Sequence, residues 1–299
     1  MELPSFTKPA GTPEQLLSKL IVQGLHVPAD ERDEALHYFR FVGAYRLKGY
    51  WHHEIDPATK RFPDGFTFTS IRQRYEFDRE LRAITLAAIE RLEVAIRVVI
   101  ADYLSLRHSP HWFLDHNVFH RSNSISLGEI LKKIEGDVAS STSSFIRHYQ
   151  ARYGHPYLPP SWAITECVTF GIWSRLYQAL RDPQDKKGIA KRFGIDQPET
   201  FGSWVHALTV LRNRVAHHGQ LLYCQLRVGP SNYKRGKIRF TDTKTYYSAA
   251  VVIQYFLTNM GLPNRWQQQL SGLLASFPGI DAAQLGFPEN WATTYPWGG

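Results

Sequence analysis

Hydrophobic residues recur at helical spacing along most of the chain. The clearest run lies between Phe77 and Leu106, where apolar positions return every three or four residues. These positions are Leu81, Ile84, Ala88, Leu92, Ile96, Val99 and Tyr103. Such spacing places the side chains on one face of an α-helix, and a helix of this length can form the central element of a bundle.

Further helices are predicted on both sides of this one. Thr12, Pro13 and Gln15 form a helix start, in which Thr12 caps the helix and Gln15 completes a capping box. The other predicted helices cover residues 29–41, 162–180, 186–192, 201–218, 243–260 and 264–277. A short β-hairpin is expected between residues 222–226 and 237–240. The predicted fold class is therefore all-α with a small β-hairpin.

The chain of 299 residues is long enough for one large domain or two ordinary ones. We expect an N-terminal helical extension over residues 1–70, a helical domain over 71–225, and a basic hairpin with C-terminal helices over 226–299 on the same body. No stretch approaches ~18 consecutive apolar residues, so we expect no membrane helix. Residues 1–12 lack a basic start followed by an apolar run, so we expect no signal peptide. Two distant cysteines, Cys167 and Cys224, favour reduced thiols and a cytoplasmic location.

Positive charge is concentrated in the second half of the chain. Residues 1–150 contain 19 Lys and Arg against 19 Asp and Glu, whereas residues 151–299 contain 16 against 8, which accounts for the whole formal net charge of +8. This distribution favours a polyanionic partner, and nucleic acid is the commonest one. The alternative is a basic surface that only keeps the protein in solution.

A group of polar residues ends the predicted helix 201–218. On a helical wheel Trp204, Leu208, Leu211 and Val215 share a buried face, and the adjoining arc holds Arg212, Asn213 and His217. Arg214 and His218 are expected to point further round, toward solvent. The arrangement predicts a partly recessed polar site. An ordinary helix end with a solvated Arg and His is the competing interpretation.

Arg212, Asn213 and His217 suit RNA cleavage that needs neither a metal ion nor another cofactor, because the ribose 2′-hydroxyl is a built-in nucleophile. His217 is a general acid or base that works near neutral pH. Arg212 offers a planar cation for the phosphate. Asn213 lies one turn before His217 and can orient the imidazole or the RNA. The expected products are a 2′,3′-cyclic phosphate and a 5′-hydroxyl.

A second candidate for RNA contact is the densest basic segment of the chain. It consists of Tyr233, Lys234, Arg235, Lys237 and Arg239. Such a loop can follow a phosphate backbone while its aromatic residue stacks on a base. Together with Arg214 and His218 it completes the predicted RNA-binding set, and a solvated hairpin tip is the alternative.

The segment from Arg212 to His217 resembles the Arg-Asn-x-x-x-His signature of the HEPN ribonuclease superfamily. More broadly, the chain resembles bacterial abortive-infection proteins of the AbiD/AbiF type. The resemblance rests on Lys8-Pro9, residues 12–15, 45–50, 77–82, 89–97, 159–162, 170–171, 211–221 and 286–291. It implies a HEPN-like helical bundle with helical extensions at both ends, a role in phage defence or toxin–antitoxin control, and RNA as substrate or partner. The catalytic residues of the family correspond to Arg212, Asn213 and His217.

One departure from two-site HEPN enzymes bears on assembly. The first half of the chain contains no convincing second motif, because Arg107 and His111 have the wrong spacing. A site with two histidines therefore needs a second copy of the chain, and we expect a homodimer. His206, on the same helix face, is the candidate for a second proton donor if the chain acts as a monomer.

Other polar clusters are weaker candidates. His111, His116 and His120, like His52, His53 and Glu54, do not supply three converging metal ligands. Glu90 and Glu93 are expected to form ion pairs with nearby arginines rather than an acid pair, and Cys167 is expected in the core. The sequence contains no Gly-rich phosphate loop.

The sequence thus predicts a metal-independent endoribonuclease of a phage-defence system. Two alternatives stay open: a non-catalytic RNA-binding protein that forms a particle with a small non-coding RNA, and a helical protein–protein interaction module.

Overall fold

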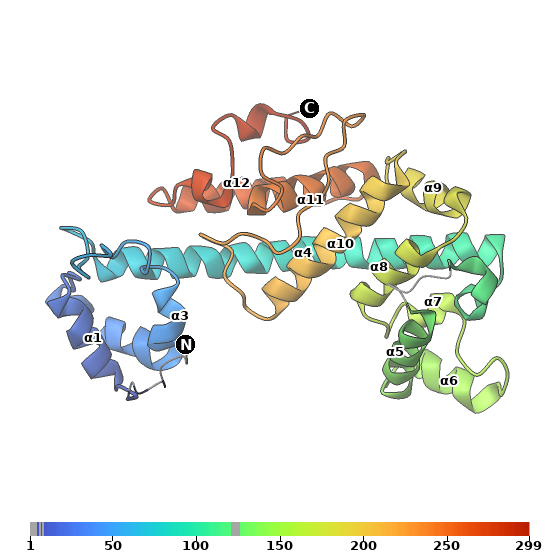
Figure 1. Ribbon diagram of the computed structural model, residues 1–299, viewed down its shortest axis with the longest axis horizontal. Helices are drawn as coiled ribbons and strands as arrows, with labels where there is room; N and C mark the ends of the chain where they lie inside the picture. The colour runs from blue at the N-terminus through green and yellow to red at the C-terminus, as the bar shows by residue number, and fades with distance from the viewer. Residues whose placement is uncertain (1–4, 6, 8, 121–125, 299) are drawn as a thin grey trace. The chain divides into compact units, whose positions relative to one another are not determined.

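The computed structural model describes residues 5, 7, 9–120 and 126–298, and this part of the chain is built from helices (Figure 1). Lys8 of the quoted pattern lies outside it. Pairing between extended segments is limited there to isolated bridges, so the all-α fold class is confirmed. Among the described helices, none combines the length and the apolar character that crossing a bilayer requires.

The chain divides into two compact units. The first comprises residues 1–81 and 273–281, and the second comprises residues 82–272 and 282–299. Helix α4 (Phe68–Arg107) supplies residues 68–81 to the first unit and 82–107 to the second. All candidate site residues belong to the second unit.

The first unit begins with α1 (Pro13–Val22) and its predicted capping box. The Thr12 side chain accepts a hydrogen bond from the Gln15 backbone, and the Gln15 side chain accepts one from the Thr12 backbone. The predicted helix 29–41 is instead a series of short elements: η1 (Ala29–Glu31), α2 (Arg32–Tyr38), η2 (Phe39–Gly43) and α3 (Ala44–Lys48). Gly43 has φ of +90°, which no regular helix accepts, so the helical path is interrupted there.

Helix α4 is longer than the apolar periodicity predicted, because it starts nine residues earlier, at Phe68. The Thr67 hydroxyl accepts a hydrogen bond from the Ser70 backbone and so caps this start. Within the second unit its buried side chains are spaced every three or four residues and include Ile89, Leu92, Glu93, Ile96, Ile100 and Leu104. The helix is therefore amphipathic, and its buried residues in this unit include two charged ones, Arg82 and Glu93.

The second unit contains most of the helices. They are α5 (Leu127–Ala139), α6 (Ser144–Arg152), α7 (Ser161–Ile164), α8 (Phe170–Ala179), α9 (Pro183–Lys191), α10 (Pro198–Ala216), α11 (Tyr246–Met260) and the start of α12 (Trp266–Ser276). Short turns of 3-10 helix are η3 (Trp112–Leu114), η4 (His116–Val118), η5 (Ala282–Leu285) and η6 (Trp291–Thr293). Helix α10 packs against α8, α9 and α11. Trp204, Leu208, Leu211 and Val215 form its buried face, as the wheel predicted.

The predicted pairing of residues 222–226 with 237–240 is not observed. The one antiparallel bridge in this described segment joins Tyr233 to Ile238, around a turn in which Lys237 has φ of +56°. The cause is the Tyr233 ring, which is buried against Trp204 of α10 and Tyr255 of α11. A Cβ at Gly236 would lie 2.2 Å from that ring, so the turn needs glycine to fold over the aromatic side chain.

Candidate functional site

The site begins with the way α10 ends. The His218 backbone N–H donates to the Val215 carbonyl at 3.1 Å, and the Gly219 N–H donates to the Arg214 carbonyl at 2.8 Å. These two bonds satisfy carbonyls that every helix C-terminus leaves open. They also fix the chain direction immediately after His217, which is the C-cap residue of α10.

His218 adopts the left-handed conformation at this helix end, with φ of +59°. Glycine usually occupies that position, but here the glycine comes one residue later. Gly219 is required for space, because a Cβ there would lie 2.7 Å from Cγ of Arg214. The sequence correctly placed the helix stop near Gly219, yet the residue with the unusual backbone is a histidine.

Glu93 of α4 binds Arg212, the candidate phosphate-binding residue. Its carboxylate accepts a hydrogen bond from Nε of Arg212 at 3.2 Å and is also ion-paired with Arg97, one turn along α4. The Glu93 side chain is only 10% exposed, whereas that of Arg212 is 39% exposed. One buried carboxylate thus joins α4 to α10 and serves two guanidinium groups.

The electrostatics of this cluster depend on that carboxylate. Burial and the nearby charge of Arg212 lower the pKa of Arg97. Arg97 also donates a hydrogen bond to the Thr165 carbonyl at 3.1 Å. Two cations held this closely repel each other; Glu93 is paired with both, and the charge of Glu166 also favours the charged form of Arg97.

Asn213 and His217 are both exposed, and their imidazole and amide groups make no hydrogen bond to any residue that the structure describes. Four residues separate them, so they lie about 40° apart around α10, while Arg212 lies about 140° from His217. The predicted trio therefore spans an arc of the helix surface, with Arg212 half-buried at one edge and His217 exposed at the other. A ligand bound by all three must lie across this end of α10.

Arg214 does not point toward solvent as the wheel predicted. Its Nε donates to the Gln220 carbonyl at 2.6 Å, and its guanidinium also contacts Sγ of Cys224. The side chain is thereby folded over the turn that follows α10. Its role in the structure is to hold that turn, while His218 remains exposed beside His217.

Tyr233 is placed where it cannot stack on a base. Its side chain is 4% exposed, its ring makes edge-to-face contacts with Trp204 and Tyr255, and its hydroxyl donates to Asp196 at 2.7 Å. The prediction that Tyr233 is a stacking residue is therefore wrong. Arg235 forms an ion pair with the same Asp196 carboxylate at 2.5 Å, and this pairing is the main reason that the pKa of Asp196 is lowered.

The other cations of the loop, Lys234, Lys237 and Arg239, are exposed. The loop is anchored on α10 at Trp204, whose indole N–H donates to the Ser231 carbonyl at 2.8 Å. Thirteen residues separate Trp204 from His217, which corresponds to about 20 Å along a helix. The anchor of the loop therefore lies far along α10 from the end that carries Arg212, Asn213 and His217.

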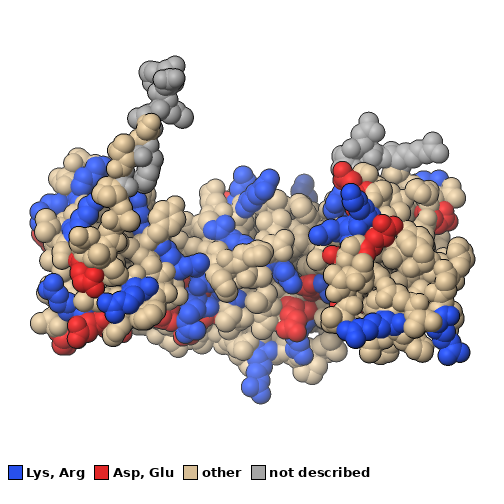
Figure 2. Space-filling model, turned by 90° about the horizontal axis from the view of Figure 1, so that it is seen from below, with Lys and Arg blue, Asp and Glu red and all other residues tan. Residues whose placement is uncertain are grey.

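Basic side chains are scattered over the face shown in Figure 2, with acidic and neutral residues among them. The excess charge of the second half does not form one continuous block on that face. In the described ranges no three His, Cys, Asp or Glu side chains converge as a metal site would require.

Sequence reasoning missed Glu93 as part of the site. The spacing of Glu93 and Arg97 indicated an ion pair, but nothing in the sequence connected either residue to Arg212, which is 119 positions away. A signal was present, since an acidic residue on the apolar face of a long helix requires a buried cationic partner.

The sequence model of a family described as Abi-like protein matches residues 37–223. This range includes the whole of α4 and the whole of α10. No curated protein and no solved structure matches the chain.

Proposed function

The chain belongs to the Abi-like protein family, and we propose that it acts in abortive infection as a metal-independent RNA endonuclease of the HEPN type. Family membership supports the defence role. The nuclease proposal rests on one observation above the others: Arg212 is held by a buried carboxylate from another helix, while His217 lies exposed five positions further along, at the end of α10.

The guanidinium of Arg212 has two edges that can donate hydrogen bonds. Glu93 accepts from Nε, and the terminal amino groups of Arg212 make no hydrogen bond to the described residues. A planar guanidinium can bind a carboxylate along one edge and a phosphate along the other. Arg212 is thus oriented before substrate binds, which reduces the cost of ordering it.

The proposed reaction is an intramolecular transesterification at phosphorus within the RNA. His217 removes the proton from the 2′-hydroxyl, whose oxygen attacks phosphorus while the bond to the 5′-oxygen breaks. Arg212 stabilises the additional negative charge on the phosphoryl oxygens. The departing 5′-oxygen takes a proton from a general acid, and the products are a 2′,3′-cyclic phosphate and a 5′-hydroxyl. Asn213 positions the imidazole or the strand.

The general acid is proposed to be His217 of a second chain in a homodimer. Base and acid act on opposite sides of the phosphate, and one helix end offers one His217. A two-fold axis beside this end would place the two copies opposite each other. Co-expressed wild-type and His217→Ala chains should then give hybrids with much less activity than their wild-type content. A monomeric active species would contradict the dimer and leave His206, exposed on α10, as the acid to test.

The nuclease proposal is tested by incubating the full-length protein with mixed RNA. Cleavage should persist with a chelator present, and the products should carry 2′,3′-cyclic phosphates. DNA, or RNA with 2′-O-methyl at the cut position, should resist. Cleavage of DNA, or complete dependence of the cleavage step on a divalent ion, would refute the mechanism. Tight RNA binding without any cleavage would favour the alternative, a ribonucleoprotein with a small non-coding RNA.

A further inference from the structure

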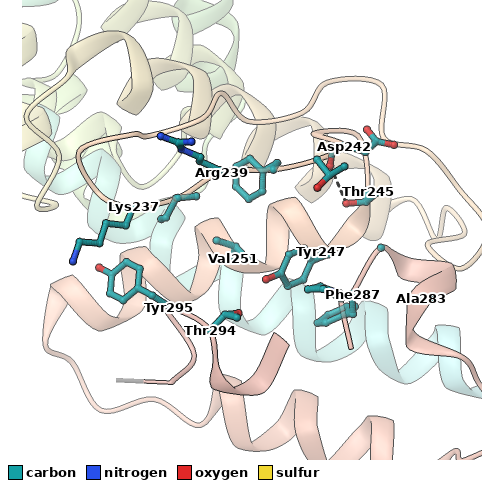
Figure 3. Close-up of a pocket in the computed structure, with 15 residues that line it drawn as sticks. Lys237, Arg239, Asp242, Thr245, Tyr247, Val251, Ala283, Phe287, Thr294 and Tyr295 are labelled. Carbon is teal, nitrogen blue, oxygen red and sulfur yellow. Dashed lines mark hydrogen bonds between the residues drawn. The ribbon is translucent and has the colours of Figure 1, made fainter. Parts of the chain in front are cut away.

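A pocket of about 520 Å³ lies between the loop after α10 and the C-terminal segment (Figure 3). Its residues come from 237–242, from the first turns of α11 and from 283–295. The volume falls within the range of about 300–1,000 Å³ that small-molecule sites occupy. None of Arg212, Asn213 and His217 lines it.

Aromatic side chains form opposite sides of this pocket. Figure 3 shows Tyr295 at one side, Tyr247 and Phe287 at the other, and Val251 between them. Tyr295 is 49% exposed, whereas Phe287 and Val251 are buried. An apolar floor with rings on either side is suited to a flat, aromatic group.

The rings are held in place by their neighbours. Tyr247 and Phe287 pack with centroids 5.0 Å apart, and Tyr295 makes an edge-to-face contact with Tyr255. Gly286 has φ of +86°, and a Cβ there would lie 2.4 Å from Cβ of Thr245. This close approach ties the segment around Phe287 to the start of α11, so the pocket exists before any ligand binds.

Two cations line the same pocket. Lys237 lies near Tyr295, and Arg239 follows it on the same segment (Figure 3). Both are exposed, and no ion pair between either of them and a described acidic residue is seen. By contrast, Lys234 and Arg235 belong to the same loop but do not line the pocket, and Arg235 is bound to Asp196.

We infer that this pocket binds one nucleotide, with the base between Tyr295 and Tyr247 and the phosphate at Lys237 and Arg239. A nucleotide joins a flat aromatic base to a phosphate dianion or diester, and stacking on tyrosine tolerates any base. The nucleotide can be free or part of an RNA strand. The site goes beyond the proposed nuclease centre and does not depend on it, since it uses none of the same residues.

Binding is tested with the full-length protein and probes that cannot be cleaved. The probes are AMP, UMP and a short fluorescent 2′-O-methyl RNA, with inorganic phosphate and phosphotyrosine for comparison. Tyr295→Ala should weaken nucleotide binding about tenfold or more, and Tyr295→Phe should stay within about twofold, because the ring rather than the hydroxyl stacks. Tyr153, which is 50% exposed on the end of α6, gives the matched control Tyr153→Ala.

The contribution of the cations is tested with a matched pair of variants. Lys237→Gln should weaken binding and reduce its salt dependence, whereas Lys234→Gln makes the same charge change on the same loop and should affect binding much less. Thermal unfolding of each variant verifies that the fold is intact.

The probes whose affinity the substitutions reduce show whether the pocket binds a free nucleotide or an RNA strand. Loss for the oligomer alone assigns the pocket to an RNA strand, loss for AMP and UMP alone assigns it to a free nucleotide, and loss for both shows a site open to either. Absence of binding, binding that Tyr295→Ala leaves unchanged, equal binding of inorganic phosphate, or tighter binding of phosphotyrosine would overturn the inference. Cleavage assays are separate, so failure of the nuclease proposal would leave these results intact.

Discussion

The two ends of α10 use a carboxylate in opposite ways. At the C-terminal end, buried Glu93 holds Arg212 and leaves it 39% exposed. Near the N-terminal half, the more exposed Asp196 accepts from Tyr233, which is buried. At the C-terminal end the carboxylate is buried, and the arginine that it binds is partly exposed to solvent. Near the N-terminal half the carboxylate of Asp196 is the more exposed partner, and the tyrosine that it binds is buried in the core.

Residue type alone therefore does not identify an RNA-binding side chain. Tyr233 and Arg212 were both predicted to contact RNA, yet the tyrosine is structural and the arginine is half-exposed. The decisive property is which partner of each pair faces solvent, and that depends on packing between distant segments.

The largest effect is expected from removing the buried carboxylate. Glu93→Gln removes the carboxylate that pairs with Arg97 and Arg212, and breaking a buried ion pair costs about 3–5 kcal/mol. Urea unfolding should show this loss in the free energy of unfolding. Glu90→Gln, an exposed change on the same helix, should cost far less. Equal effects of the two substitutions would remove the distinction between the two ends.

The next largest effect is expected on catalysis. In the proposed mechanism His217 transfers the proton, so His217→Ala should reduce RNA cleavage by about 10²-fold or more while the unfolding midpoint stays near wild type. Single-turnover cleavage of one RNA substrate is the measurement. His148, exposed on α6, provides the control His148→Ala. Wild-type cleavage by His217→Ala would show that the exposed end of α10 is not the active site.

Tyr233→Phe tests the carboxylate pair near the N-terminal half of α10. It removes the hydrogen bond to Asp196 and should lower the free energy of unfolding by about 1 kcal/mol. RNA affinity should not change, because the ring is buried and cannot reach a base. Fluorescence anisotropy with a labelled RNA measures the second effect. A stable Tyr233→Phe variant with clearly weaker RNA binding would restore Tyr233 as a contact residue.

The smallest effect concerns pH. Arg235 and Tyr233 lower the pKa of Asp196 in the folded protein below its ordinary value of 3.8. The carboxylate therefore stabilises the fold fully above about pH 4, and this contribution is lost as the pH falls through the lowered folded pKa. Asp196→Asn should make stability less dependent on pH in this acidic range. Parallel pH profiles for the variant and the wild type would contradict it.

Features encoded in short stretches were predictable from sequence. The capping box at Thr12, the buried face of α10 and the stop near Gly219 depend on residues a few positions apart, and each was found in the structure. The all-α class followed from the same periodicity. The early start of α4 was missed because residues 68–76 are mostly polar and signal the helix only through the Thr67 cap.

Features that join distant segments were not predictable. The bond from Glu93 to Arg212 and the burial of Tyr233 against Tyr255 link helices far apart in sequence. The inward turn of Arg214 depends on how the chain leaves α10. A helical wheel describes one helix by itself, so it misplaces any side chain that the next segment covers. The assignment of Arg212, Asn213 and His217 as catalytic residues stays a prediction.

Helix α10 also sets the distance between His217 and the anchor of the loop that carries Lys237 and Arg239. The loop that carries Lys237 and Arg239 is anchored at Trp204, and His217 lies thirteen residues further on, about 20 Å away along the helix axis. At a stacked rise of about 3.4 Å per nucleotide, that distance corresponds to about six nucleotides. If both proposals hold, an RNA that occupies the pocket of one chain and is cut at His217 of the same chain would have a minimum size, and the position of the cut would be set by its distance from the bound nucleotide rather than by the sequence around it.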